Sequence, residues 1–429
     1  MKREEFERLV QHAGMAVPEG IEAYLADIDP QPGGPLVSRA FLRRAAERAG
    51  VGESRLQQLT HALEAIEKDP QLLRLALALR EDVHRALIHQ RACEHERPLP
   101  QCLQGFDREA YSLLFALGCL ERGLKQLEAR GLPKEDYEEV CWRMADGQLK
   151  RFEKTGDPAI GNYSWDMNFY GCGIFFLDRL YFIPFKWGEP TAYRRHSDGK
   201  VVALWPEGAK VRQDGQLDGT NGVHDPQAFT TTWQEDDRAV TAYPVNPVGI
   251  IRREPVTLLK AEWTAALKEG DMTLAAHIPG GEGYTPQRWK SSMEQAKAFF
   301  DRWFPEVETR GFWSESWLYD PSLYRLLPAE GRIMSVQQQF YNYPTPEGES
   351  MAKLEVFGGD DVDLAAVEAS TSLQVKLRDS LLKGEHYHTS GMFVLHEDLP
   401  RFGQRPYQTD QDIRDYHVQT GGQDAADRA

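Results

Sequence analysis

The sequence is poor in cysteine and has no long apolar run. Its cysteines are Cys93, Cys102, Cys119, Cys141 and Cys172. Their odd number and irregular spacing match neither a zinc motif nor a redox motif, so we interpret them as reduced thiols of a reducing compartment. No segment approaches the ~20 apolar residues that a bilayer span needs, and the charged N-terminus lacks the apolar core of a signal peptide. These features predict a cytoplasmic protein with no membrane partner.

Basic residues are fewer than acidic residues. Lys and Arg together number 50 against 66 Asp and Glu, which gives a formal net charge of -16. A nucleic-acid binder needs a basic face to meet phosphates, so we predict no nucleic-acid partner. A local basic pocket for one phosphorylated ligand remains compatible with this balance. The 41% hydrophobic and 27% charged residues are typical of a globular protein, and 429 residues are too many for one ordinary core.

The N-terminal third of the chain has the pattern of successive helices. Ser38 can cap a helix that carries Phe41 and Leu42. After Ser54, Leu56, Leu59 and Leu63 have the spacing of residues that share one face of another helix. Further helices are expected over residues 72–87, 107–131 and 133–152. Several short helices with brief connections predict an all-α bundle, which we assign to residues 1–155.

The pattern changes after Gly156, where aromatic residues, glycine and proline become frequent. Strands are expected at 174–176 and 180–183, meeting at a turn near Asp178, and at 201–204. The expected order then is helix 256–267, strand 272–278, helix 285–304, strand 311–318, a short helix from 320, strand 333–341, helix 371–382 and strand 391–395. The predicted fold is therefore α+β, with a mixed α/β sheet domain over 156–400 and a polar, loosely held tail over 401–429.

A glycine-rich turn lies between the strand ending near residue 278 and the next helix. Such a turn lets backbone N–H groups approach an anion, and the positive end of the helix dipole adds to the attraction. The candidate phosphate-binding residues are Ile278, Gly280, Gly281, Gly283, Arg288 and Lys290. The alternative is that the glycines only make a tight turn.

Three residues are candidates for acid–base chemistry. His277 ends the strand before the glycine turn, and it is either a base or a hydrogen-bonded structural histidine. Glu315 alternates with Trp313 and Trp317, and a carboxylate between two tryptophans would have a raised pKa and could act as a general base. The alternative is an edge-strand glutamate that faces water. Tyr324 could protonate a leaving thiolate, or it could be a packing aromatic.

Other residues suggest contacts with a substrate or a metal. Trp165, Asp166 and Trp317 are candidate substrate-binding residues, although core packing accounts for them equally well. His386 and His388 have the spacing of strand-borne metal ligands, but no third ligand lies nearby in the sequence. We therefore predict no metal.

Four stretches in the same order resemble a family of bacterial acyltransferases with a helical N-terminal domain and a GNAT-like C-terminal domain. They are Ile174–Phe182; Ala276–Gly281 with Ser291–Phe300, Phe304 and Pro305; Glu315–Leu318 with Asp320, Pro321, Leu323 and Leu327; and Thr371–Gln374 with Leu382, Gly384 and Gly391. The resemblance implies a mixed sheet that is split in the middle, with coenzyme A wedged in the split.

The resemblance also implies a function. The chain would transfer an acyl group, most simply acetyl, from acyl-CoA to a small-molecule amine by direct attack in a ternary complex. By their positions, Glu315 or His277 would be the base and Tyr324 the acid. A non-catalytic acyl-CoA-binding or regulatory protein on the same fold is the alternative. The acceptor, the acyl length and the existence of a homo-oligomer stay open.

Overall fold

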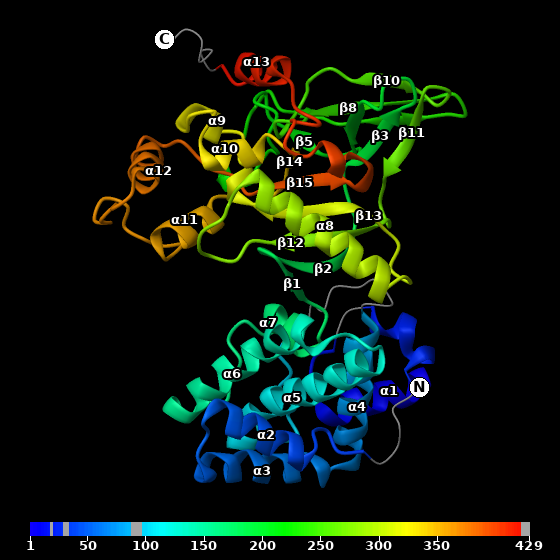
Figure 1. Cartoon of the computed structure of the whole chain (residues 1–429), viewed down its shortest axis with the longest axis vertical. Helices are drawn as coiled ribbons and strands as arrows, with labels where there is room; N and C mark the ends of the chain where they lie inside the picture. Colours follow the sequence, from blue (N-terminus) through cyan, green and yellow to red (C-terminus); the bar gives the residue numbers. More distant parts are fainter. Residues whose placement is uncertain (18–19, 29–33, 87–96, 422–429) are drawn as a thin grey trace. The chain divides into compact units, whose positions relative to one another are not determined.

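The computed structural model describes residues 1–17, 20–28, 34–86 and 97–421 (Figure 1). The chain divides into two compact units. The first unit comprises Met1–Phe176, Tyr181–Phe185 and Phe299–Val307, and the second comprises Leu177–Leu180, Lys186–Ala298 and Glu308–Ala429. Cys93 and the expected helix end at Leu87 lie outside the described residues. The other four cysteines form no disulfide.

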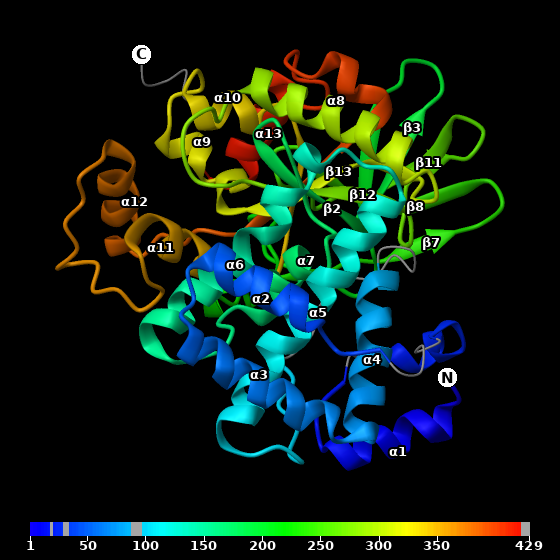
Figure 2. The same ribbon diagram turned by 60° about the horizontal axis from the view of Figure 1, so that its bottom comes forward.

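The first unit is helical. Its elements are α1 (Arg3–Ala13), η1 (Ile21–Asp27), α2 (Arg39–Ala49), α3 (Glu53–Glu67), α4 (Pro70–Ala86), α5 (Gly105–Ala129), η2 (Lys134–Asp136), α6 (Glu138–Thr155) and α7 (Tyr163–Tyr170). Helix α5 contacts α3, α4, α6 and α7, so it is the central helix of the unit (Figure 2). Its residues Leu113, Leu114 and Leu117 are fully buried, which explains the long apolar run in its sequence.

Short polar side chains fix where these helices begin. The Ser38 hydroxyl accepts a hydrogen bond from the Phe41 N–H at 3.1 Å, which confirms the predicted cap of α2. The helix expected after Ser54 is α3, which begins at Glu53 with Gly52 in the N-cap position and buries Leu56, Leu59 and Leu63. The structure adds a cap at Asp69, whose Oδ1 accepts from the N–H groups of Gln71 and Leu72 at 3.0 Å each.

The strands β1 (Phe175–Leu177) and β2 (Leu180–Lys186) confirm the predicted strand pair, and Asp178 at the turn has a left-handed φ of 60°. Four further strands of the mixed sheet follow the order β12-β13-β15-β14. They are β12 (Met272–His277), β13 (Thr309–Ser316), β15 (Ser390–Leu395) and β14 (Tyr341–Pro344). Strands β12 and β13 are parallel and are joined by α8 (Pro286–Trp303), whereas β15 is antiparallel to both β13 and β14 (Figure 1). A β–α–β unit therefore forms the centre of this sheet.

A second, antiparallel sheet has the order β10-β8-β4-β3-β11. Its strands are β3 (Thr191–Arg195), β4 (Val201–Trp205), β8 (Ala239–Asn246), β10 (Val256–Leu259) and β11 (Trp263–Leu267); β7 (Trp233–Glu235) and β9 (Ile250–Ile251) also pair with β8, and β5 (Lys210–Val211) pairs with β6 (Phe229–Thr230). The Tyr341 hydroxyl of β14 donates to Val245 O at 2.6 Å and accepts from Ala203 N at 2.9 Å. This phenol links the two sheets across a core that contains Trp205 and Phe393.

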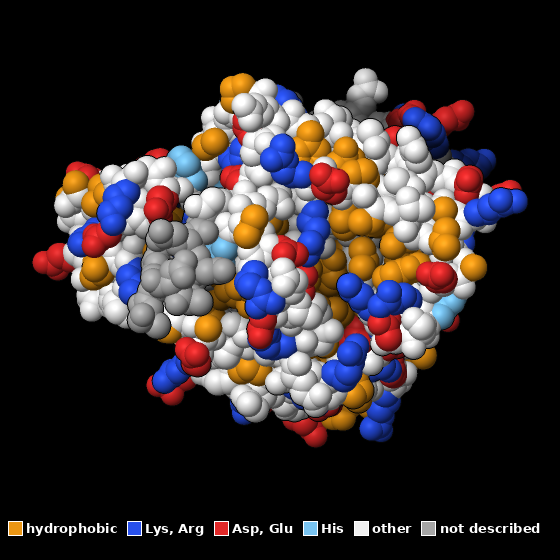
Figure 3. Space-filling view, turned by 90° about the horizontal axis from the view of Figure 1, so that it is seen from above, with side chains coloured by type: hydrophobic (Ala, Val, Ile, Leu, Met, Phe, Trp, Pro, Cys, Tyr) orange, Lys and Arg blue, Asp and Glu red, His pale blue; other side chains and the backbone are white. Residues whose placement is uncertain are grey.

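The remaining elements are η3 (Thr220–Gly222), η4 (Trp317–Tyr319), α9 (Leu323–Leu326), α10 (Arg332–Gln337), α11 (Ser350–Phe357), α12 (Ser372–Leu382), η5 (His396–Arg401) and α13 (Asp410–Gln419). No helix in the described part of the chain combines the length and apolar character that a bilayer span requires. On the face that Figure 3 shows, acidic and basic side chains are interspersed.

The predicted α+β fold class is confirmed, but three local predictions are wrong. Residues 256–267 form β10 and β11 rather than a helix, because they pair with β8 and β3. Residues 333–341 are mostly helix α10, and the strand begins only at Tyr341. The tail after Pro400 is predicted to be loosely held, but it forms helix α13 and buries Tyr416.

Candidate functional site

The two parallel strands of the mixed sheet open a cavity at their carboxyl ends. Their pairing extends to Ala275 opposite Trp313. His277 and Glu315 each follow two residues later, so both lie on the same face as their paired neighbours. The cavity has a volume of about 360 Å³, and we call it the strand-end cavity. Its lining residues are His277, Trp313, Glu315, Glu347, Gly348, Ser350, Met351 and Thr389.

The environment of this cavity changes the acidity of its two central groups. Burial lowers the pKa of His277 to about 4, so its imidazole is neutral at neutral pH. Burial raises the pKa of Glu315, the charge of Glu347 raises it further, and a hydrogen bond from Thr345 offsets part of the effect. Of the two, Glu315 is the stronger base near neutral pH.

A close backbone contact fixes the wall of the strand-end cavity. Gly391 lies opposite both Glu315 and Tyr343 in the sheet. A Cβ at Gly391 would lie 2.2 Å from Cζ of Tyr343, so only glycine leaves room for that ring. The Tyr343 hydroxyl in turn accepts a hydrogen bond from the Trp313 indole N–H at 2.5 Å. The glycine therefore permits the contact that orients Trp313 at the cavity.

The other predicted catalytic and substrate residues do not line the strand-end cavity. The Tyr324 hydroxyl donates to Gln408, and its ring lies 6.1 Å from that of Tyr416. Trp317 does not share a strand face with Glu315 as predicted, because β13 ends at Ser316; Trp317 is buried with Leu323, Met334 and Tyr387.

Trp165 and Asp166 belong to α7 of the first unit. The Trp165 ring packs edge-on against Phe169 with ring centres 5.7 Å apart, so part of its surface serves the core. Burial raises the pKa of Asp166 to about 6. Neither Trp165 nor Asp166 is among the residues that line the strand-end cavity.

The glycine turn is held by an arginine that sequence reasoning missed. The Arg179 guanidinium donates to the carbonyls of Pro279 and Glu282 at 2.7 Å each and to that of Gly281 at 3.2 Å. Gly281 and Gly283 have φ values of 105° and 92°, which L-residues avoid. The signal was the Asp178–Arg179 pair at the β1–β2 turn, whose role depends on a contact about one hundred residues away.

The predicted phosphate-binding side chains already have partners within the protein. Arg288 forms an ion pair with Asp178 at 2.8 Å, and Lys290 donates to Pro400 O at 3.0 Å. By contrast, apart from the two adjoining residues, no heavy atom lies within 4 Å of the position that a Cβ would take at Gly280 or Gly281. An anion therefore has access to the backbone of these two glycines beside the start of α8.

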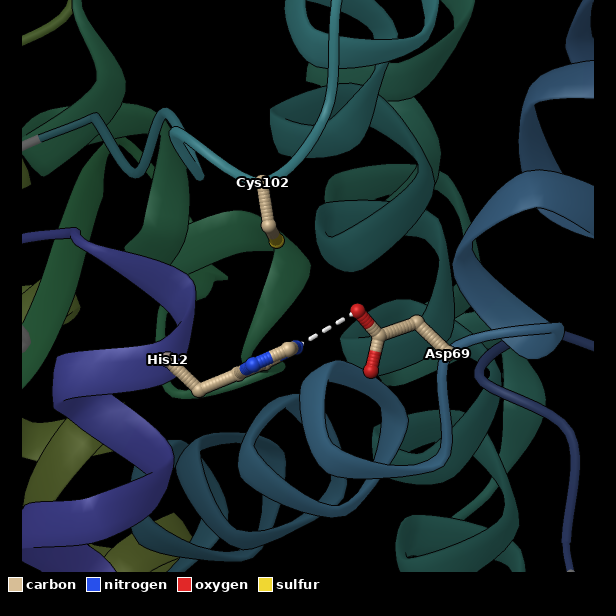
Figure 4. A group of neighbouring side chains, drawn as sticks. All are labelled: His12, Asp69 and Cys102. Atoms are coloured by element: carbon tan, nitrogen blue, oxygen red, sulfur yellow. Dashed lines mark hydrogen bonds and ion pairs between the residues drawn. The ribbon is translucent and has the colours of Figure 1, made fainter.

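Three side chains of the first unit lie close enough to share a metal ion: His12, Asp69 and Cys102 (Figure 4). His12 Nε2 lies 2.7 Å from Asp69 Oδ2, while the other oxygen of Asp69 caps α4. We interpret the group as a cap that joins the end of α1 to the start of α4. In the second unit, the two histidines with the spacing of metal ligands have different partners. His386 lies 3.0 Å from Glu349, and His388 lies 3.2 Å from Arg212.

The parallel strands whose pairing ends at Ala275 and Trp313, the joining helix and the glycine turn have the arrangement of a GNAT-like fold. The chain belongs to the family of the GNAT-like C-terminal domain, whose model matches residues 174–393. This confirms the resemblance found in the sequence. None of the curated proteins matches the chain.

Solved structures share the fold over nearly the whole chain. One is an acyltransferase in complex with decanoyl-CoA, with 16% identity over 92% of this chain and 99% of that chain and a TM-score of 0.51. Another is an acyltransferase in complex with decanoyl-CoA and teicoplanin, with 19% identity over 91% of this chain and 99% of that chain and a TM-score of 0.51. At these identities the likeness establishes the fold and leaves the chemistry to the site.

Proposed function

We propose that this protein is an acyltransferase that moves an acyl group from acyl-CoA to a small-molecule amine, with residues 156–400 as its catalytic domain. The observation that carries the proposal is the strand-end cavity, where the fold brings His277 and Glu315 together at the ends of two parallel strands. The acyltransferases with the same fold bind octanoyl-CoA or decanoyl-CoA, which supports an acyl-CoA donor here.

In the proposed reaction, residues of the strand-end cavity remove a proton from the amine and hydrogen-bond the reacting groups. The amine nitrogen attacks the thioester carbonyl carbon, the C–S bond breaks, and the sulfur leaves as a thiolate. The Glu315 carboxylate removes the proton from the amine, since its pKa is raised by burial and by the neighbouring Glu347. The thiolate then takes up a proton to give free coenzyme A. His277, neutral and at the strand end, is in place to hydrogen-bond the reacting groups.

The glycine turn would hold the pyrophosphate of the donor. The backbone of Gly280 and Gly281 is open to an anion, and α8 directs its N-terminus toward the turn. Arg179 fixes the turn from the side of its carbonyl groups. Its role is to position the turn before the ligand arrives, which lowers the entropy lost on binding.

Two measurements test the proposal. The first is calorimetric titration with coenzyme A and with acetyl-, octanoyl- and decanoyl-CoA, for which we expect micromolar binding that is lost when Gly281 is replaced by tryptophan. The second is release of free thiol in the presence of a panel of amines, for which Glu315→Gln is expected to slow turnover by about 10²–10⁴-fold. The exposed Glu355 of α11 provides the matched control, Glu355→Gln.

The outcomes separate the alternatives. No binding of any acyl-CoA would refute the proposal. Binding without thiol release across the panel would favour the non-catalytic acyl-CoA-binding protein instead. Thiol release that Glu315→Gln leaves unchanged would keep the transferase but remove Glu315 as its base.

A further inference from the structure

The second unit contains another cavity, which none of the residues considered for acyl transfer lines. It has a volume of about 210 Å³, and we call it the Arg212 cavity. Its polar lining includes Arg212, Gln216, Asp320, Arg325 and His388. Several of these side chains are more than nine-tenths buried, which is unusual for charged and amide groups without a full set of partners.

One nitrogen of the Arg212 guanidinium, Nη1, has no hydrogen-bond partner among the described residues. Its Nε and Nη2 donate to the two carboxylate oxygens of Asp214 at 3.2 and 3.1 Å, and Nη2 also lies 3.2 Å from His388 Nε2. Nη1 is also buried. A buried cationic donor of this kind is costly unless an acceptor meets it.

Gln216 presents an acceptor at the same cavity. The residue is only 4% exposed. Its Nε2 donates to Gly249 O at 3.3 Å, whereas its Oε1 is buried without a partner among the described residues. Two residues that line the cavity thus carry an unfilled donor and an unfilled acceptor, and Arg325 adds a second cation to its wall.

The acidic groups that border the Arg212 cavity are already engaged. Asp214 is paired with Arg212, and Asp320 accepts from the N–H groups of Ser322 at 2.8 Å and His388 at 2.6 Å. Glu385 accepts from the Ser380 hydroxyl. The groups left for a ligand are therefore the guanidinium donors, the Gln216 carbonyl and the Ser322 hydroxyl, which is also buried without a partner among the described residues.

We propose that the Arg212 cavity binds a small oxyanion that carries its own O–H group, such as a hydroxycarboxylate or hydrogen phosphate. The anionic oxygens accept from Nη1 of Arg212 and from Arg325, and the O–H of the ligand donates to Oε1 of Gln216. This ligand satisfies the orphaned groups of Arg212 and Gln216 at once, which neither a simple cation nor an apolar molecule does. The site is close to the strand-end cavity, because His388 lines one and the adjacent Thr389 lines the other.

The test uses the full chain and three probes. Malate and succinate differ by one hydroxyl, and inorganic phosphate provides the second kind of oxyanion. We expect calorimetry to show a Kd of about 1 mM or tighter for malate or for phosphate. Arg325→Gln should weaken that binding about tenfold or more, because it removes a charge-assisted contact. Arg253→Gln, at an exposed position of the same unit, should leave it unchanged.

The contribution of Gln216 is tested separately. Malate should bind more tightly than succinate, and Gln216→Met should remove the difference; thermal unfolding checks that each variant is folded. A response to malate but not phosphate identifies the hydroxycarboxylate as the ligand class, and the reverse identifies phosphate. Absence of binding by both, or equal weakening by Arg325→Gln and Arg253→Gln, would overturn the proposal. Acyl-CoA affinity, measured on the same samples, reports on the transferase independently.

Discussion

Replacing Arg179 by methionine should weaken the glycine turn without altering any residue of the turn itself. Arg179 is 8% exposed, and its guanidinium donates to three carbonyl groups, those of Pro279, Gly281 and Glu282. A hydrogen bond from a charged donor contributes about 1.5–3 kcal/mol when it is buried. Because the turn lies at the surface, water can replace part of this interaction, and methionine retains the apolar part of the side chain. We therefore expect a loss of about 2 kcal/mol in the free energy of unfolding.

Two assays measure the consequences. In a unit of this size, a loss of about 2 kcal/mol lowers Tm by roughly 4–8 °C. A turn that must be ordered during binding should also raise the KM for acyl-CoA by about tenfold, with a smaller effect on kcat. Arg179→Lys keeps the charge but loses the planar fork, so it should fall between the wild type and Arg179→Met. Unchanged Tm and unchanged KM in Arg179→Met would refute the role assigned to this side chain.

Three other changes probe different parts of the second unit. Asp398 is 1% exposed and accepts hydrogen bonds from Nη1 and Nη2 of Arg194. Because Arg194 keeps Glu397 as an ion-pair partner, Asp398→Ala should cost about 1.5–3 kcal/mol in chemical denaturation, through the loss of these charged hydrogen bonds. Burial raises the pKa of Glu315 in the folded state, so the folded wild type binds more protons than the unfolded chain and loses stability as pH rises. Glu315→Gln lacks this group, so its free energy of unfolding relative to the wild type should increase from pH 4 to pH 8. A difference that stays constant with pH would argue against the burial of Glu315. Thr371→Ala should cost about 1 kcal/mol, since Thr371 and Gln374 form a capping box at the start of α12; an unchanged unfolding midpoint would contradict that cap.

Local signals in the sequence were sufficient for much of the fold. The cap at Ser38, the Thr285–Pro286 start of α8 and the capping box at Thr371 each act within three residues, so the sequence contains the whole interaction. The apolar stripes of the helices follow from the same short range. The strand, turn and helix around residues 272–303 were predicted for this reason, and the structure places His277 and Glu315 at one cavity.

Longer contacts decided the rest. Residues 256–267 are strands because Val256 pairs with Ala242 and Trp263 pairs with Arg195, and no local pattern contains those partners. Tyr324 turns to Gln408, 84 residues later, rather than to the strand-end cavity. The sequence by itself determined most of the N-terminal helices, the start of α8 and the central β–α–β unit, because those depend on neighbours a few residues apart. Only the tertiary structure decided which carbonyls Arg179 holds and which polar groups remain open at the Arg212 cavity, because these depend on contacts between segments remote in the chain.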